Sequence, residues 1–298
     1  ALLAHLRELA RAFFDLPAAA KRREQSATGS ISRGYIAQGR ENLGLTLGDD
    51  ATHTDLKEQL AFGPLDPRSP PMEANLWPSQ PAGFAAAVRA YYRAMESLAG
   101  DLLRGFAVAL DMPPGHFAPF FERHGNVLRI LHYPDQAGRA PGPGETRSGA
   151  HTDYGALTIL MAEDAPGGLQ VKLRGGGWVD VRPAPHTFII NIGDLMAMWT
   201  NDRWISNLHR VVNPPPDAAA GSRRLSAAYF VNANPDALIT CIPTCALATA
   251  PKYPPVLAGV HRAAKIALSR GTGRAGEPPL SPQSAAFPAP PLAQESSS

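Results

Sequence analysis

The chain has 298 residues, of which 44% are apolar and 18% are charged, and this composition excludes charge-driven disorder of the chain as a whole. Its 28 basic and 26 acidic residues give a net charge of +2, a balance that argues against nucleic acid or a membrane surface as a partner. The two cysteines, Cys241 and Cys245, exclude a disulfide scaffold and fit a reducing compartment, so that we expect a cytoplasmic protein without a membrane span.

The first part of the chain predicts helices. Apolar residues recur every three or four positions over residues 2–14 and again over 84–106, which is the period of an amphipathic helix. A polar, glycine-rich stretch at 25–54 separates the two patterns, and a short helix is expected at 116–123. We therefore expect a region of helical support over residues 1–125.

After this region the apolar period shortens to about two residues, which is typical of strands. Turn sequences, among them 138–149 and 193–194, separate the β-rich runs. These runs predict strands at residues 127–133, 157–161, 169–173, 178–181, 187–192, 208–212, 225–231 and 238–242. Short strands at this spacing predict a mainly β core, a sandwich or jelly roll, over residues 126–245.

Two segments follow the expected core. An apolar pattern predicts a final helix over residues 256–269, within a C-terminal region of residues 246–270. Residues 271–298 consist largely of proline, alanine, serine and glycine. Because this composition offers little to a packed core, it predicts a disordered tail.

The tripeptide His151-Thr152-Asp153 lies next to an expected strand. In an extended chain, side chains two positions apart point to the same face and lie about 6.5 Å apart along the strand, so both can approach one metal ion. Two imidazoles and one carboxylate, with open positions opposite, suit non-haem Fe(II). His209, in an apolar and strand-like run, is the candidate for the third ligand. The tripeptide alone is a weak signal, because such short motifs also arise by chance.

Arg224 and Ser226 are also two positions apart at the start of an expected strand. A guanidinium group and a hydroxyl group on one face are well suited to bind a carboxylate. For Arg224 taken alone, an ion pair at the surface or between regions of the chain is the alternative.

Four motifs in order carry a resemblance to a known family. The segments 148–158, 191–211, 224–226 and 128–134 resemble the signature segments of the isopenicillin N synthase-like family of iron oxygenases, most of which use 2-oxoglutarate. Weaker similarities lie at residues 13–17, 33–35 and 55–58. The resemblance extends from about residue 1 to about residue 269.

The resemblance implies a double-stranded β-helix, or jelly roll, with Fe(II) between its sheets. It implies that the metal ligands are His151, Asp153 and His209. Arg224 and Ser226 would hold the distal carboxylate of 2-oxoglutarate, the cosubstrate, and Tyr133 would add a hydrogen bond. The expected reaction consumes O₂ and 2-oxoglutarate, releases succinate and CO₂, and oxidises a small-molecule substrate, with hydroxylation as the default outcome.

The chain departs from the family pattern in three places. The usual first strand and its lead-in are missing, so we expect a truncated start. Leu131 stands where many relatives carry asparagine, and the C-terminal tail carries no recognisable lid motif. None of these departures affects an expected metal ligand.

Three further residues are candidates for substrate contacts. Arg33 and Tyr35 lie in the polar N-terminal loop, and loops on a rigid scaffold often carry such contacts. Phe230 shares a strand face with Arg224 by period. The alternative is a packing or surface role for Arg33 and Tyr35, and core packing for Phe230.

Two other functions remain open at this point. In keto-acid-independent oxidases of the same fold, the Arg-x-Ser pair grips the substrate's own carboxylate. A non-catalytic ligand-binding relative would keep the fold with a damaged metal site. The arginine- and alanine-rich composition suggests a bacterial enzyme of specialised metabolism, and the oligomeric state is left open.

Overall fold

A computed structural model describes residues 1–47, 54–66, 73–139, 141–246 and 249–269 of the chain. The helices are α1 (Leu2–Phe14), α2 (Ala18–Arg22), α3 (Phe84–Ala109), α4 (Asp194–Trp199) and α5 (Ala258–Ser269). The strands are β1 (Gly34–Ile36), β2 (Glu58–Phe62), β3 (Val127–Tyr133), β4 (Ser148–His151), β5 (Leu157–Ala162), β6 (Leu169–Lys172), β7 (Trp178–Asp180), β8 (Ile189–Ile192), β9 (His209–Val211), β10 (Arg224–Val231), β11 (Leu238–Ile239) and β12 (Val256–Leu257). The tail at 271–298, which we expect to be disordered, lies outside the described residues.

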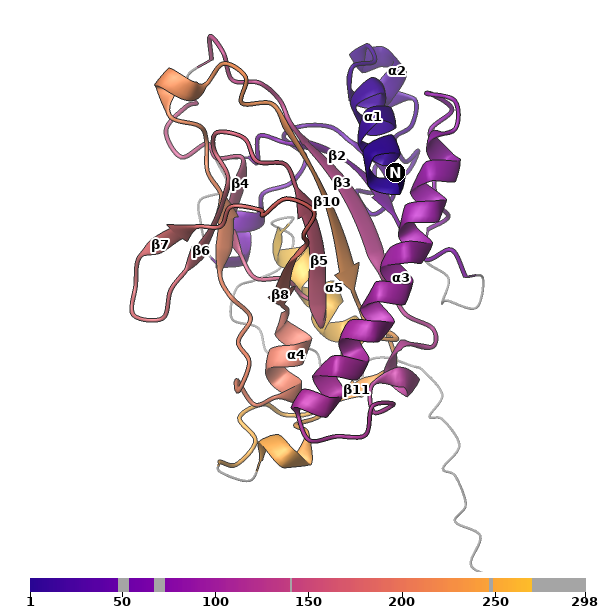
Figure 1. The fold of residues 1–298 in the computed structure, drawn as a ribbon, viewed down its shortest axis with the longest axis vertical. Coiled ribbons are helices and arrows are strands. Elements are labelled where there is room, and N and C mark those ends of the chain that lie inside the picture. Colours follow the sequence, from indigo (N-terminus) through magenta and orange to yellow (C-terminus); the bar gives the residue numbers. More distant parts are fainter. Residues whose placement is uncertain (48–53, 67–72, 140, 247–248, 270–298) are drawn as a thin grey trace, which may run out of the picture.

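The strands form two main antiparallel sheets (Figure 1). The larger sheet has the order β1-β2-β3-β10-β5-β8, and the smaller has the order β4-β9-β6-β7. Both sheets together make the jelly roll that the sequence predicts. Helices α1 and α3 cover the face of the larger sheet that points away from the smaller one (Figure 1).

Successive side chains of β10 point to opposite faces of the larger sheet, as in any strand, so the two faces have different surroundings. One face packs in the core and comprises Leu225, Ala227 and Tyr229. The opposite face lines a cavity between the sheets and comprises Arg224, Ser226, Ala228 and Phe230. One face of the larger sheet therefore packs in the hydrophobic core, and the other face lines the cavity.

The predicted helices at 2–14, 84–106 and 256–269 are confirmed as α1, α3 and α5, and most predicted strands are confirmed. The expected short helix at 116–123 is a single 3₁₀ turn at Ala118–Phe121. The run at 238–242 forms β11, which pairs with β12 in a separate two-stranded sheet instead of joining the core. No helix of the described residues is both long enough and apolar enough to cross a membrane.

Further elements differ from the expectation. The supposedly helical region contributes β1 and β2 to the larger sheet. The sequence does not predict β2 because its buried Glu58 and Gln59 break the apolar alternation. Lys21 pairs with the carboxylate of Glu58, and Gln59 donates a hydrogen bond to Glu41. The expected turn at 138–149 ends in β4, and the expected turn at 193–194 begins α4. The division of the chain into regions at 125, 245 and 270 stays a prediction.

Candidate active site

A cavity of about 360 Å³ lies between the two sheets. Its walls come from the inner faces of β3, β5, β8 and β10 on one side and of β4, β6 and β9 on the other. All three predicted metal ligands, both predicted carboxylate-binding residues, Tyr133 and Phe230 line it. The sequence motifs therefore meet in one place although they span about a hundred residues.

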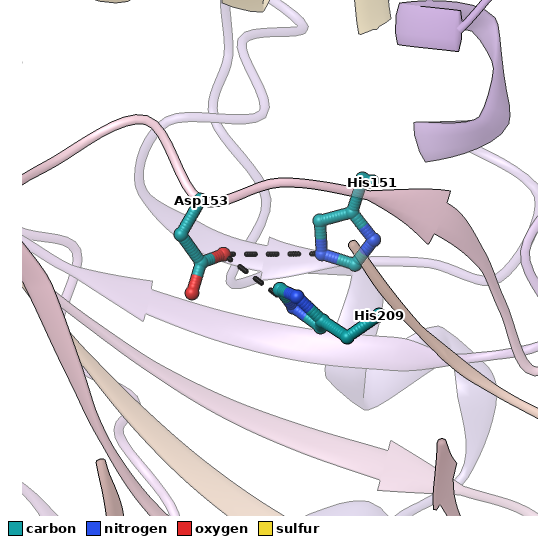
Figure 2. Close-up of side chains that lie close together, drawn as sticks. All are labelled: His151, Asp153 and His209. Atoms are coloured by element: carbon teal, nitrogen blue, oxygen red, sulfur yellow. Dashed lines mark ion pairs between the residues drawn. The ribbon is translucent and has the colours of Figure 1, made fainter. Parts of the chain in front are cut away.

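His151, Asp153 and His209 converge on one point (Figure 2). Asp153 Oδ1 lies 3.9 Å from His151 Nε2 and 3.8 Å from His209 Nε2. The potential ligand atoms of the three side chains all lie within 4.8 Å of one another. Metal–ligand bonds of roughly 2.0–2.2 Å place two ligands of one ion about 3–4 Å apart, so the arrangement fits a shared ion.

The strand pairing explains this convergence. β4 pairs with β9, and His151 stands directly opposite His209 in that pairing. A register irregularity separates the two paired positions in β4, and the chain leaves the strand after His151 so that Asp153 can turn toward the imidazoles (Figure 2). Two paired strands of one sheet, together with the segment that follows β4, thus supply all three side chains.

Hydrogen bonds aim each ligand atom. His151 Nδ1 donates to the carbonyl oxygen of Gly149 at 2.7 Å, and His209 Nδ1 donates to that of Asn207 at 3.0 Å. Both rings therefore carry their proton on Nδ1 and present the lone pair of Nε2 to the shared point.

The carboxylate of Asp153 is oriented in the same way. Its Oδ2 accepts hydrogen bonds from Thr158 Oγ1 and from Asn191 Nδ2, both at 2.6 Å. Oδ1 is thereby left to face the two imidazoles. Such outer contacts fix ligand geometry and tune the affinity for the metal.

The protonation states suit a cation. Burial, aided by the charge of His209, lowers the pKa of His151 to about 3, which keeps its imidazole neutral at physiological pH. Burial alone would raise the pKa of Asp153, but the two imidazoles and the two hydrogen bonds outweigh burial and lower it. Neutral histidine and ionised aspartate are the forms that bind metal ions.

The opposite part of the cavity wall contains Arg224, whose guanidinium group lacks hydrogen-bond partners for two of its nitrogen atoms among the described residues. Arg224 is buried, and these two atoms are its Nε and Nη1. Its guanidinium carbon lies 5.1 Å from the ring centre of Tyr133, and Ser226 lies on the same face of β10. Burial lowers the pKa of Arg224. A buried guanidinium group without an acceptor calls for an anionic ligand.

Other cavity residues escaped the sequence analysis. Lys57 is buried, with its Nζ at 2.6 Å from Asp55 Oδ2, 3.1 Å from Ser148 Oγ and 3.4 Å from Glu41 Oε2. Asn191 lies in the second motif that carries the family resemblance, but only the fold brings its amide to Asp153. The weak similarity at residues 55–58 was the one available signal for Lys57.

The structure gives no support to substrate contacts by Arg33 and Tyr35, neither of which is among the described residues that line the cavity. Tyr35 packs edge-on against Phe13, and its hydroxyl donates to Glu58 Oε2 at 2.5 Å. The guanidinium group of Arg33 lies against Gly63, where a Cβ atom would collide with it. Both side chains are buried because the polar loop folds onto β2, and this supports the packing alternative. Phe230, by contrast, lines the cavity.

Replacing Tyr35 with phenylalanine tests that packing role. The change removes one hydrogen bond to a buried carboxylate, so we expect the free energy of unfolding to fall by about 1–2 kcal/mol, with the rate of the expected 2-oxoglutarate reaction unchanged. Urea denaturation and steady-state kinetics measure the two effects. Tyr253→Phe is the matched control, because it removes an exposed Tyr–Asp hydrogen bond. Unchanged stability with impaired turnover would contradict the packing role.

Comparison with known proteins agrees with this geometry. The sequence model of the 2OG-Fe(II) oxygenase superfamily matches residues 124–233, and that of the N-terminal region of non-haem dioxygenases in morphine synthesis matches residues 1–80. A 2-oxoglutarate-Fe(II) type oxidoreductase of Emericella nidulans is 32% identical over 280 residues, which cover 90% of this chain and 77% of that protein. A homoarginine-6-hydroxylase of rice is 32% identical, with 89% of this chain and 80% of that protein covered.

A solved structure extends the likeness to three dimensions. The full-length Neurospora crassa protein in complex with alpha-KG and thymine superimposes with a TM-score of 0.76 at 32% identity, over 89% of this chain and 83% of that one. The predicted jelly-roll fold is confirmed by this match. The chain belongs to the 2OG-Fe(II) oxygenase superfamily, whose members are oxidoreductases that use Fe(II) and 2-oxoglutarate.

Proposed function

We propose that His151, Asp153 and His209 bind the Fe(II) ion and that Arg224, with Ser226 and Tyr133, binds the distal carboxylate of 2-oxoglutarate. The observation that carries this assignment is the convergence of three candidate metal ligands in a cavity that also holds the buried guanidinium group of Arg224, whose Nε and Nη1 have no hydrogen-bond partner among the described residues. The donor set of two imidazoles and one carboxylate is the one that non-haem Fe(II) prefers.

The bound metal supplies the redox chemistry that couples O₂ and 2-oxoglutarate to substrate oxidation, with succinate and CO₂ as co-products. The chain's own residues place the reactants. Arg224 and Ser226 anchor one end of the keto acid and thereby direct its other end toward the three ligands. Apolar side chains of the cavity wall, among them Leu131, Leu160 and Val211, exclude water from the reacting centre.

We propose a small molecule as the substrate and hydroxylation as the reaction. The cavity volume of about 360 Å³ leaves room for the cosubstrate and one compact molecule. Relatives support the same class, since the rice relative is named for homoarginine and the Neurospora protein binds thymine.

Succinate release tests this function. With Fe(II) and O₂, the protein should convert 2-oxoglutarate to succinate, slowly alone and faster with a substrate. Oxidation of a substrate without succinate would instead favour a keto-acid-independent oxidase. A protein that neither consumes 2-oxoglutarate nor binds the metal would instead fit a non-catalytic ligand-binding relative. Each of these two results would overturn the proposal.

Replacing Thr158 with valine tests the outer contacts of the metal site. Valine keeps the shape of threonine but removes the hydrogen bond to Asp153. We expect a 10- to 100-fold loss of Mn(II) affinity, which is typical when a partner of a ligand is removed. Titration calorimetry measures the affinity, and Thr244→Val, which removes a hydrogen bond to the backbone of Leu110, is the matched control. Equal affinity in wild type and variant would contradict the role given to Thr158.

The setting of the enzyme is also proposed. The free thiols Cys241 and Cys245 support a reducing, cytoplasmic compartment. The balanced charge supports an enzyme without nucleic-acid or membrane partners. A role in specialised metabolism rests on composition alone.

A further inference from the structure

A second, smaller cavity of about 80 Å³ adjoins the large one. The residues His151, Asp153 and Phe230 belong to the walls of both cavities. Arg224 belongs only to the large one, and Arg262 only to the small one. A molecule at the proposed metal site can therefore reach into the small cavity without displacing a keto acid bound at Arg224.

One face of α5 forms a wall of the small cavity. Arg262, Ile266 and Ser269 all line it, and their spacing of four and three residues places them on one side of a helix. This helix lies far along the chain from the strands that carry the proposed metal ligands. Its side chains nevertheless reach the same space because the chain returns to the jelly roll after β12.

The adjacent face of α5 fixes the orientation of the helix. Lys265 Nζ lies 3.0 Å from Asp194 Oδ2, and His261 Nε2 lies 3.4 Å from the same oxygen. Lys265 also donates to Thr152 Oγ1 at 3.2 Å, beside Asp153. These contacts tie α5 to the start of α4 and to the segment that carries the proposed metal ligand, so the position of Arg262 is set by the fold.

Arg262 has no hydrogen bond and no ion pair within the described part of the chain. Its surroundings are positive, since burial and the nearby Arg33 and Arg129 lower its pKa to about 10, and it still carries its charge at neutral pH. Arg129 is compensated by Glu41, whose Oε1 lies 2.8 Å from Arg129 Nη1. The wall of the small cavity therefore presents a cation whose counter-charge the described chain does not supply.

We propose that Arg262 binds the carboxylate of a small organic acid that is the enzyme's substrate, and that it thereby determines substrate specificity. The planar guanidinium group offers a carboxylate two parallel hydrogen bonds. The neighbouring side chains Leu43, Phe230 and Ile266 provide apolar walls for the rest of the molecule. The carboxylate end in the small cavity then leaves the carbon skeleton beside the proposed metal site. This inference rests on the proposed function.

Calorimetric titration of matched acid and amide pairs tests the proposal. The protein is loaded with Mn(II), which binds without turnover, and saturated with 2-oxoglutarate, so that Arg224 is occupied. Phenylacetate, 3-phenylpropanoate and cyclohexanecarboxylate are each compared with the corresponding primary amide, which has the same shape and no charge. We expect at least one acid to bind about ten-fold or more tightly than its amide.

Variants of Arg262 test whether this residue causes the preference for acids over amides. Arg262→Gln should reduce the acid-to-amide ratio to below about two-fold, and Arg262→Lys should retain part of it because the charge remains. Arg104→Gln, which removes an exposed arginine of α3 paired with Asp101, should behave as wild type.

Two results would overturn the inference. The first is that no acid binds the wild type more tightly than its amide, and the second is that the preference survives Arg262→Gln. In both cases intact binding of Mn(II) and 2-oxoglutarate would leave the proposed function standing. A wild-type protein that binds neither Mn(II) nor 2-oxoglutarate would overturn the proposed function and this inference together.

Discussion

Replacing Asp153 with alanine is expected to abolish metal binding and 2-oxoglutarate turnover together. The change removes the carboxylate on which both imidazoles converge. Loss of an outer contact alone typically lowers metal affinity 10- to 100-fold, so loss of the ligand itself should lower it by more than about 100-fold. Equilibrium dialysis with Mn(II) and succinate formation with Fe(II) measure the two effects.

A second variant separates this effect from misfolding. Asp153→Ala leaves the buried donors of Thr158 and Asn191 without an acceptor, which itself destabilises the protein. Of the hydrogen bonds described, His209→Ala breaks the one to the backbone of Asn207 and leaves those of Asp153 intact, so it should lose metal binding while keeping the unfolding midpoint. Asp101→Ala, at an exposed position of α3, is the control for both. Metal affinity near the wild-type value in either ligand variant would contradict the proposed site.

Replacing Arg224 with glutamine is expected to raise the KM for 2-oxoglutarate by about 30-fold or more. Removing one member of a buried charge pair typically costs about 2–5 kcal/mol, and each 1.4 kcal/mol corresponds to a factor of ten. Initial rates of succinate formation at varied 2-oxoglutarate concentrations measure the effect. Metal affinity in the absence of 2-oxoglutarate should stay near the wild-type value, because Arg224 does not contact the proposed ligands.

A cosubstrate analogue provides the matched probe for Arg224. The compound 2-oxopentanoate keeps the keto acid end and lacks the distal carboxylate, so it should bind the wild type poorly and the variant about equally poorly. Arg104→Gln should leave the KM unchanged. A variant that still distinguishes 2-oxoglutarate from 2-oxopentanoate as the wild type does would contradict the assignment of Arg224.

The sequence predicts most of the strands and the proximity of His151 to Asp153 because both depend on short-range periodicity. The alternation along β10 already places Arg224 and Ser226 on one face, and the structure turns that face toward the cavity. The spacing of His151 and Asp153 limits them to one short segment. Only the jelly-roll topology, implied by the resemblance, brings His209 opposite His151.

Other features depend on contacts that no local pattern contains. The β2 segment looks polar in the sequence because it begins with Glu58. The carboxylate of Glu58 can be buried because it pairs with Lys21 and His132, and both partners are distant in sequence. Arg262 reaches the small cavity only through the packing of α5 on α4 and the metal-binding segment. Tyr35 is the opposite case, since a residue in a polar segment is buried in the core.

Labelled oxygen tests the central claim most directly. When the enzyme turns over 2-oxoglutarate with Fe(II) under ¹⁸O₂, we predict that the succinate carries one ¹⁸O atom and that the ligand variants at 153 and 209 form no labelled succinate. Succinate without label, or labelled succinate from those variants at the wild-type rate, would contradict a site in which the three side chains hold the iron beside the keto acid.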